Sequence, residues 1–136
     1  MLESLHPAQP VYCIYPHLYL QTARSFVSGF PGRVLYAVKA NDEPAVIRLL
    51  HQGGVEHFDC ASVAEIALVR KNCPDAKCYF MIPVSPRGAS GQAFHDHGVR
   101  HFMVDDASRL EALASEVPLD QTVVFARMAV SHESAM

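Results

Sequence analysis

The chain has 136 residues, of which 50% are hydrophobic, and its formal net charge is -3. This length suffices for one domain with an ordinary core, and the negative charge without a lysine or arginine cluster excludes nucleic acid as an expected partner. No apolar run approaches the roughly 20 residues of a membrane span, so no membrane contact is expected. Residues 1–7 lack the pattern of a secretory signal, which predicts a cytoplasmic protein.

The predicted elements alternate between strands and helices after one leading helix, as in α/β proteins with a parallel sheet. In chain order we expect helix 18–29, strand 33–39, helix 43–52, strand 55–59, helix 63–72, strand 77–82, helix 91–97, strand 100–104, helix 107–116 and strand 122–128. Right-handed crossovers make consecutive strands neighbours, but the pattern alone does not choose between a barrel and an open doubly wound sheet. No boundary divides residues 1–136, so one domain is expected.

Local signals support these helix ends. Gly29-Phe30-Pro31-Gly32 and Gly53-Gly54 are typical stop signals after helices. Ser62 stands three residues before Glu65, which is the spacing of a capping box, and Pro74 ends the helix that follows. The four cysteines, at positions 13, 60, 73 and 78, have no paired spacing and predict free thiols.

The stretch Val34-Leu35-Tyr36-Ala37-Val38-Lys39-Ala40-Asn41 places one lysine at the end of an apolar strand, just before a turn. A strand fixes the position of its last side chain, and apolar walls disfavour the ammonium form. Lys39 would then be a nucleophilic amine suited to an aldehyde cofactor. The alternative is an ordinary strand-end lysine whose charged end reaches solvent.

The carboxyl ends of parallel strands meet at one edge, where functional groups of such sheets gather. The predicted edge carries Lys39–Asn41, Asp59–Ala61, Pro83–Ser85, Asp105–Asp106 and Arg127.

Two other features are weaker candidates for sites. Gly88-Ala89-Ser90-Gly91 offers a few backbone amides to a phosphate, but short glycine pairs are more often plain turns. His95-Asp96-His97 and His101 suggest metal ligands, yet their spacings do not converge on one ion. We therefore predict no metal site.

Four motifs in chain order carry a resemblance to a known family. They are Tyr36-Ala37-Val38-Lys39-Ala40-Asn41, His57-Phe58-Asp59-Cys60-Ala61-Ser62 followed by Glu65, Gly98-Val99-Arg100-His101-Phe102-Met103-Val104-Asp105, and Val123-Val124-Phe125-Ala126-Arg127. Together they resemble the barrel of the ornithine/diaminopimelate/arginine decarboxylases, the alanine-racemase-like enzymes that use pyridoxal phosphate. The resemblance runs from about Val11 to Arg127 and selects a partial (β/α)8 TIM barrel over an open sheet.

The resemblance implies a role for each of four residues. Lys39 would form the Schiff base with the cofactor and release it to the incoming amino acid. Asp59 would lie near Lys39 and hold its cation, Arg127 would lie near the cofactor ring, and Ala37 would pack against that ring. A strand-end or helix-capping role for Asp59 and a buried ion pair for Arg127 are the alternatives. Glu65 matches the glutamate of the family motif, but its capping-box role is a sufficient explanation.

The expected function is decarboxylation of a basic amino acid, of the ornithine, lysine or diaminopimelate type, in polyamine or lysine biosynthesis. Relatives of this kind are much longer and form homodimers, so the chain is expected to be an N-terminal barrel fragment that is inactive alone. The alternatives are an amino acid racemase or cofactor carrier of the same barrel class, or a non-catalytic homologue that binds partners. Phe58-Asp59-Cys60-Ala61-Ser62 favours the decarboxylases.

Overall fold

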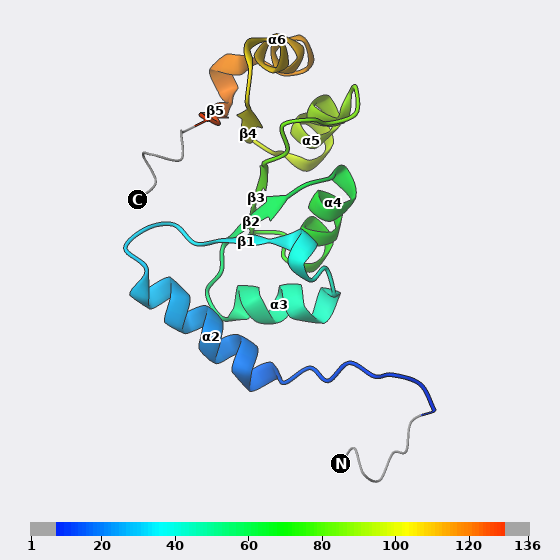
Figure 1. Cartoon of the computed structure of the whole chain (residues 1–136), viewed down its shortest axis with the longest axis vertical. Helices are drawn as coiled ribbons and strands as arrows, with labels where there is room; N and C mark the ends of the chain where they lie inside the picture. Colours follow the sequence, from blue (N-terminus) through cyan, green and yellow to red (C-terminus); the bar gives the residue numbers. More distant parts are fainter. Residues whose placement is uncertain (1–7, 130–136) are drawn as a thin grey trace.

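A single parallel sheet organises the computed structural model, which describes residues 8–129 (Figure 1). Its five strands follow one another in the order β1-β2-β3-β4-β5, and each pairs in parallel with the next. The strands are β1 (Leu35–Ala37), β2 (His57–Cys60), β3 (Lys77–Phe80), β4 (His101–Val104) and β5 (Val123–Ala126). The predicted number and order of strands are confirmed.

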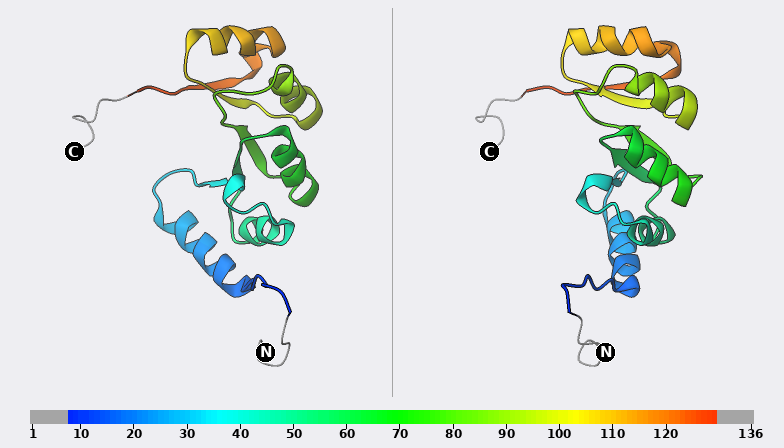
Figure 2. Two further views of the ribbon diagram at one scale, coloured as in Figure 1. Left: turned by 45° about the vertical axis from the view of Figure 1, so that its right-hand side comes forward. Right: turned by 90° about the vertical axis from the view of Figure 1, so that its right-hand side faces the viewer.

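Helices cover one face of this sheet, and the leading helix packs against the first of them (Figure 2). The helices are α2 (Pro16–Gly29), α3 (Pro44–Gln52), α4 (Val63–Asn72), α5 (Ala89–His97) and α6 (Ala107–Glu116), with 3-10 turns η1 (Val38–Ala40) and η2 (Leu119–Gln121). Every predicted helix is present. Proline occupies the first turn of α2 and of α3, where its missing N–H costs no hydrogen bond.

Side-chain caps determine where two of the helices begin. The Ser62 hydroxyl accepts from the Glu65 amide (3.1 Å), and the Glu65 carboxylate accepts from the Ala61 amide (2.8 Å). Asp106 caps α6 in the same way, accepting from the Arg109 amide at 2.9 Å. These bonds satisfy amides that the first helical turn leaves free, so the capping box predicted for α4 is confirmed.

The core lies between the sheet and the helices. Alternate strand residues point toward the helices and are buried there, and the largest of them are Phe58 and Phe102. Helix residues Ile47, Ile66 and Val69 are fully buried against this layer. Burial of this apolar surface is the main source of stability for the fold.

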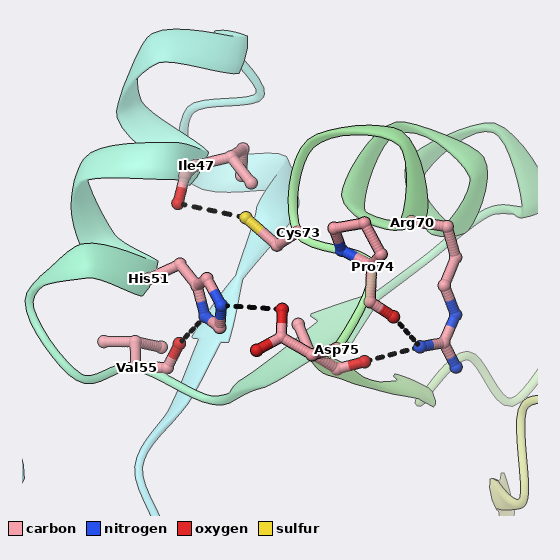
Figure 3. Close-up of polar contacts among 8 residues, drawn as sticks. Ile47, His51, Val55, Arg70, Cys73, Pro74 and Asp75 are labelled. Carbon is pink, nitrogen blue, oxygen red and sulfur yellow. Dashed lines mark hydrogen bonds and ion pairs between the residues drawn. The ribbon is translucent and has the colours of Figure 1, made fainter.

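Polar contacts tie α3 to the turn that follows α4 (Figure 3). The His51 ring donates from Nδ1 to the Val55 carbonyl (3.0 Å), and its Nε2 lies 3.1 Å from the Asp75 carboxylate. The Arg70 guanidinium donates to the carbonyl oxygens of Pro74 and Ala76. These bonds fix the loops that enter β2 and β3, at the end of the sheet opposite to the predicted site.

All four cysteines are free thiols, as predicted. Cys13 is exposed, whereas Cys60, Cys73 and Cys78 are buried under the helices. The pKa of the Cys60 thiol is raised by its hydrogen bond to Cys78 and by burial. Cys60 therefore behaves as a neutral core residue.

The Glu116 carboxylate closes the start of α5 from the end of α6. It accepts from the Gly88 amide at 2.7 Å and from the Gly91 amide at 3.1 Å. The two glycine amides that seemed available to a phosphate are thus bound by a side chain of the same chain. This segment is therefore a plain structural turn, which was the alternative to a phosphate site.

We expect Glu116→Ala to lower the free energy of unfolding by about 2 kcal/mol, because two charge-assisted hydrogen bonds are lost in a partly exposed setting. Glu116→Gln should cost roughly half as much, since its amide oxygen still accepts one bond. Urea denaturation measures both. Glu111→Gln, at an exposed position on the same helix, serves as the control, and an equal loss in that variant would show that only helix charge is involved.

Candidate active site

Lys39 lies at the carboxyl edge of the sheet, directly after the first strand. The prediction that the strand continues to Lys39 is wrong: β1 ends at Ala37, and Lys39 stands in the 3-10 turn η1. The turn closes because the Asn41 amide donates to the Val38 carbonyl at 3.1 Å. A hydrogen bond within the turn has replaced the strand ladder at this point.

The surroundings of Lys39 are open. Its side chain is exposed and borders a cavity of about 450 Å³, formed by residues 12–14, Tyr19 and residues 39–43. The apolar walls expected around the amine are thus not provided by the described residues. This exposure agrees with the alternative in which Lys39 reaches solvent, and its proposed reaction with an aldehyde stays a prediction.

Asp59 lies beside the first strand at the same edge. It is a β2 residue paired in register with Ala37, so the two side chains lie on the same face of the sheet. Ser62 caps α4, which removes the helix-capping alternative for Asp59. Burial raises the pKa of the Asp59 carboxyl, the Lys39 ammonium opposes that rise, and the Glu65 carboxylate adds to it. Asp59 and Lys39 are therefore electrostatically coupled.

This raised pKa predicts a pH dependence of stability. The folded state keeps the Asp59 proton to higher pH than the unfolded state does, so ionisation of Asp59 lowers the free energy of unfolding as pH rises. We expect Asp59→Asn to lack this loss, and hence to gain stability relative to the wild type between about pH 4 and about pH 7. Urea denaturation at several pH values measures the difference.

Asp120→Asn is the matched control, because Asp120 is exposed in η2, away from this edge. If the free energies of unfolding of Asp59→Asn and the wild type differ by the same amount at every pH, this result would contradict the raised pKa of Asp59.

Arg127 follows the last strand. Its amide donates to the Val104 carbonyl at 2.8 Å, which continues the pairing of β4 with β5. The side chain is exposed, so the alternative of a buried, paired arginine is wrong. β1 and β5 occupy the two outer positions of the sheet, with three strands between them. The structure thus brings together Lys39, Ala37 and Asp59, and leaves Arg127 on the opposite edge strand.

A polar and aromatic cluster on the uncovered face of the sheet was missed by sequence reasoning. Tyr79, only 1% exposed, stacks on His101 with ring centroids 4.1 Å apart. Arg33 donates to the Tyr79 hydroxyl (3.0 Å), which lies 3.3 Å from Nδ1 of His57. Burial, then the Arg33 charge, lowers the pKa of His57 and of His101. Because Arg33 donates to the Tyr79 oxygen, the Tyr79 hydroxyl donates its own hydrogen bond to Nδ1 of a neutral His57.

The signal for this cluster was available in the alternation of the strands. Tyr79 is paired in register with His101 and with Asp59, and His57 lies two residues before Asp59, so all three rings face away from the helices. Among residues 8–129, no group of three metal-ligating side chains is close enough to hold an ion. Within the same range, no helix is long and apolar enough to cross a membrane.

The fold and the site together define a class of protein. Its parallel α/β sheet presents, at the carboxyl edge, a lysine amine coupled to a carboxylate. The family described as "Pyridoxal-dependent decarboxylase, pyridoxal binding domain" matches residues 19–136. The chain belongs to this family, whose cofactor is pyridoxal phosphate.

Individual relatives agree with this assignment. The chain is 35% identical over 105 residues to a lysine/ornithine decarboxylase of Selenomonas ruminantium, a match that covers 76% of the chain and 25% of the relative. Ornithine decarboxylase from Entamoeba histolytica superposes with a TM-score of 0.70 at 26% identity, covering 82% of this chain and 32% of that one.

An arginine decarboxylase of Paramecium bursaria Chlorella virus shows the same fold, with a TM-score of 0.78 at 22% identity over 90% of this chain and 33% of that one. The sheet thus corresponds to part of the TIM barrel of these decarboxylases. The chain spans between a quarter and a third of the length of these relatives.

Proposed function

We propose that this chain supplies the lysine-bearing part of a pyridoxal-phosphate-dependent decarboxylase that acts on a basic amino acid. The observation that carries the proposal is the placement of Lys39 at the carboxyl edge of the sheet, beside a cavity and coupled to Asp59. An exposed amine at this edge is accessible to the aldehyde of the cofactor. The chemistry of the residues therefore fits the group that the family binds.

Each of the residues at this edge has a proposed task. Lys39 would hold the cofactor through its amine and would be released when the substrate amino group takes its place. Asp59 would keep a negative charge beside the Lys39 nitrogen and so favour its cationic form. Ala37, which is paired with Asp59 and has a small side chain, leaves room for the cofactor ring. Arg127 lies near the ring once the sheet curves into a closed barrel.

When bound, pyridoxal phosphate supplies the electron sink that makes loss of carbon dioxide from an amino acid possible. The chain's own contribution is to orient the amine and to keep a carboxylate near it. Asp59 is suited to this role because its pairing with Ala37 places its carboxyl at the same edge as Lys39, and the charge of Lys39 favours its ionised form.

We further propose lysine or ornithine as the substrate. The Selenomonas relative is a lysine/ornithine decarboxylase, and one solved relative holds pyridoxal phosphate together with cadaverine, the diamine formed when lysine loses its carboxyl group. Such an activity belongs to polyamine biosynthesis and to the cytoplasm. Because the chain spans a quarter to a third of its relatives, we propose that turnover requires the rest of their length, in a homodimer, and that the isolated chain is inactive.

Titration of the purified chain with pyridoxal phosphate tests the cofactor proposal. We expect a saturable change in cofactor absorbance at about one equivalent per chain, because Lys39 is the amine placed at the functional edge. The chain incubated with pyridoxal phosphate and either lysine or ornithine should form no more diamine product than the same mixture without the chain. Absence of saturable uptake would contradict the cofactor proposal, and amine production would contradict the inactivity of the isolated chain.

A further inference from the structure

Tyr36 connects the core of the chain to the turn that carries Lys39. The Tyr36 hydroxyl donates to the Asn41 carbonyl oxygen at 3.2 Å, spanning the 3-10 turn between them. Its ring lies edge-on to Phe58, with centroids 6.2 Å apart and an interplanar angle of 76°. Tyr36 therefore has one end in the core and the other on the backbone just after Lys39.

The turn itself depends on few contacts. Val38 is fully buried and anchors one side of the turn. On the other side, the Asn41 amide donates to the Val38 carbonyl (3.1 Å), and the Asn41 side-chain oxygen accepts from the Glu43 amide (3.0 Å). Because the Lys39 side chain is exposed, its position is set by this backbone rather than by packing around the amine.

We propose that Tyr36 is a positioning residue, whose hydroxyl fixes the turn from Val38 to Asn41 and thereby aims the Lys39 amine at the cofactor. This inference rests on the proposed function. Tyr36 is paired with Phe58 and points toward the helices, whereas the neighbouring pair of Ala37 and Asp59 points the other way. Tyr36 thus acts through the backbone and makes no contact with the reacting groups.

The surroundings of the Tyr36 hydroxyl keep it protonated, so that it remains a hydrogen-bond donor. Burial raises the pKa of the Tyr36 hydroxyl, with the Tyr19 hydroxyl and the Asp42 carboxylate adding to the rise and the bond to Asn41 opposing it. The hydroxyl therefore stays protonated and keeps donating to the Asn41 carbonyl. Tyr36→Phe removes this one bond and leaves the ring packing on Phe58 unchanged.

The test compares Tyr36→Phe with Tyr79→Phe in the full chain. Tyr79→Phe also loses a hydroxyl that is hydrogen-bonded, but its partners Arg33 and His57 lie near the amino ends of the strands. Hydrogen exchange at the amides of Asn41 and Glu43 reports on the turn without any cofactor. We expect exchange to become roughly five-fold faster in Tyr36→Phe, the change in opening equilibrium that one hydrogen bond produces, and to stay unchanged in Tyr79→Phe.

A second measurement reports on the amine. Each variant is incubated with pyridoxal phosphate and reduced with borohydride, and mass spectrometry gives the ratio of labelling at Lys39 to labelling at Lys71. Lys71 is an exposed lysine in the last turn of α4 and serves as an internal reference. The ratio should fall roughly five-fold in Tyr36→Phe alone, which a general loss of stability would not produce.

The positioning role would be overturned if the Asn41 and Glu43 amides exchange in Tyr36→Phe at the wild-type rate. It would also be overturned if exchange changes equally in Tyr36→Phe and Tyr79→Phe. Faster exchange with an unchanged labelling ratio would also overturn it, because the turn would then move without affecting the amine. If the wild type leaves Lys39 unlabelled, the proposed function fails, and the exchange rates alone then decide whether Tyr36 fixes the turn.

Discussion

Replacement of Lys39 by alanine should abolish the saturable uptake of pyridoxal phosphate by this chain. Covalent attachment to an amine is the step that holds the cofactor in the proposal, and Lys39 is the lysine at the carboxyl edge of the sheet. Uptake should fall from about one equivalent per chain to the low, unsaturable level of scattered surface amines. Absorbance titration of the wild type and the variant measures the change.

Lys71→Ala is the matched control for this substitution. Lys71 is also exposed, but it lies in the last turn of α4, away from the carboxyl edge of the sheet. Its replacement should leave the uptake unchanged. Equal losses in the two variants would indicate nonspecific reaction with lysines, and an unchanged uptake in Lys39→Ala would place the cofactor-linked amine elsewhere.

Phe58→Ala should cause the largest loss of stability. Phe58 is 0% exposed, and its ring contacts Tyr36 from β1 and His51 from α3, at centroid distances of 6.2 Å and 6.4 Å. Truncation of such a ring leaves a cavity and costs about 3–5 kcal/mol. Domains of this size have a net stability of roughly 5–15 kcal/mol, so much of the population should unfold at moderate urea concentrations.

The control for Phe58→Ala is Phe26→Ala, because Phe26 is 63% exposed on α2. That variant should change the free energy of unfolding by less than about 0.5 kcal/mol. Similar losses in both variants would show that Phe58 does not lie in the main core.

Much of the fold could be predicted because its signals are local. α4 and α6 begin at Val63 and Ala107, as predicted, and the start of α4 follows from the local cap at Ser62. Strand order followed from the short crossovers between consecutive strands. Strand ends were less predictable: β3 ends at Phe80 rather than at Ile82, because after one last bond, from the Met81 amide to the Cys60 carbonyl (3.2 Å), the chain enters the loop before α5.

The site was predicted in part. The sequence placed Lys39 and Asp59 at one edge, and the register confirms that their strands are neighbours. It did not predict the early end of β1, since the bond from the Asn41 amide to the Val38 carbonyl replaces the strand ladder there, and strand periodicity does not encode that turn. It also did not predict the exposure of Lys39, because burial at the edge of a sheet depends on which segments cover it.

Borohydride reduction of the wild-type chain after incubation with pyridoxal phosphate is the most direct test of the role of Lys39. Peptide mapping by mass spectrometry then locates the reduced cofactor on the sequence. A single modified peptide that contains Lys39, at about one equivalent per chain, is the predicted result. Modification spread equally over Lys39, Lys71 and Lys77, or none at all, would contradict the assignment of Lys39 as the amine that holds the cofactor.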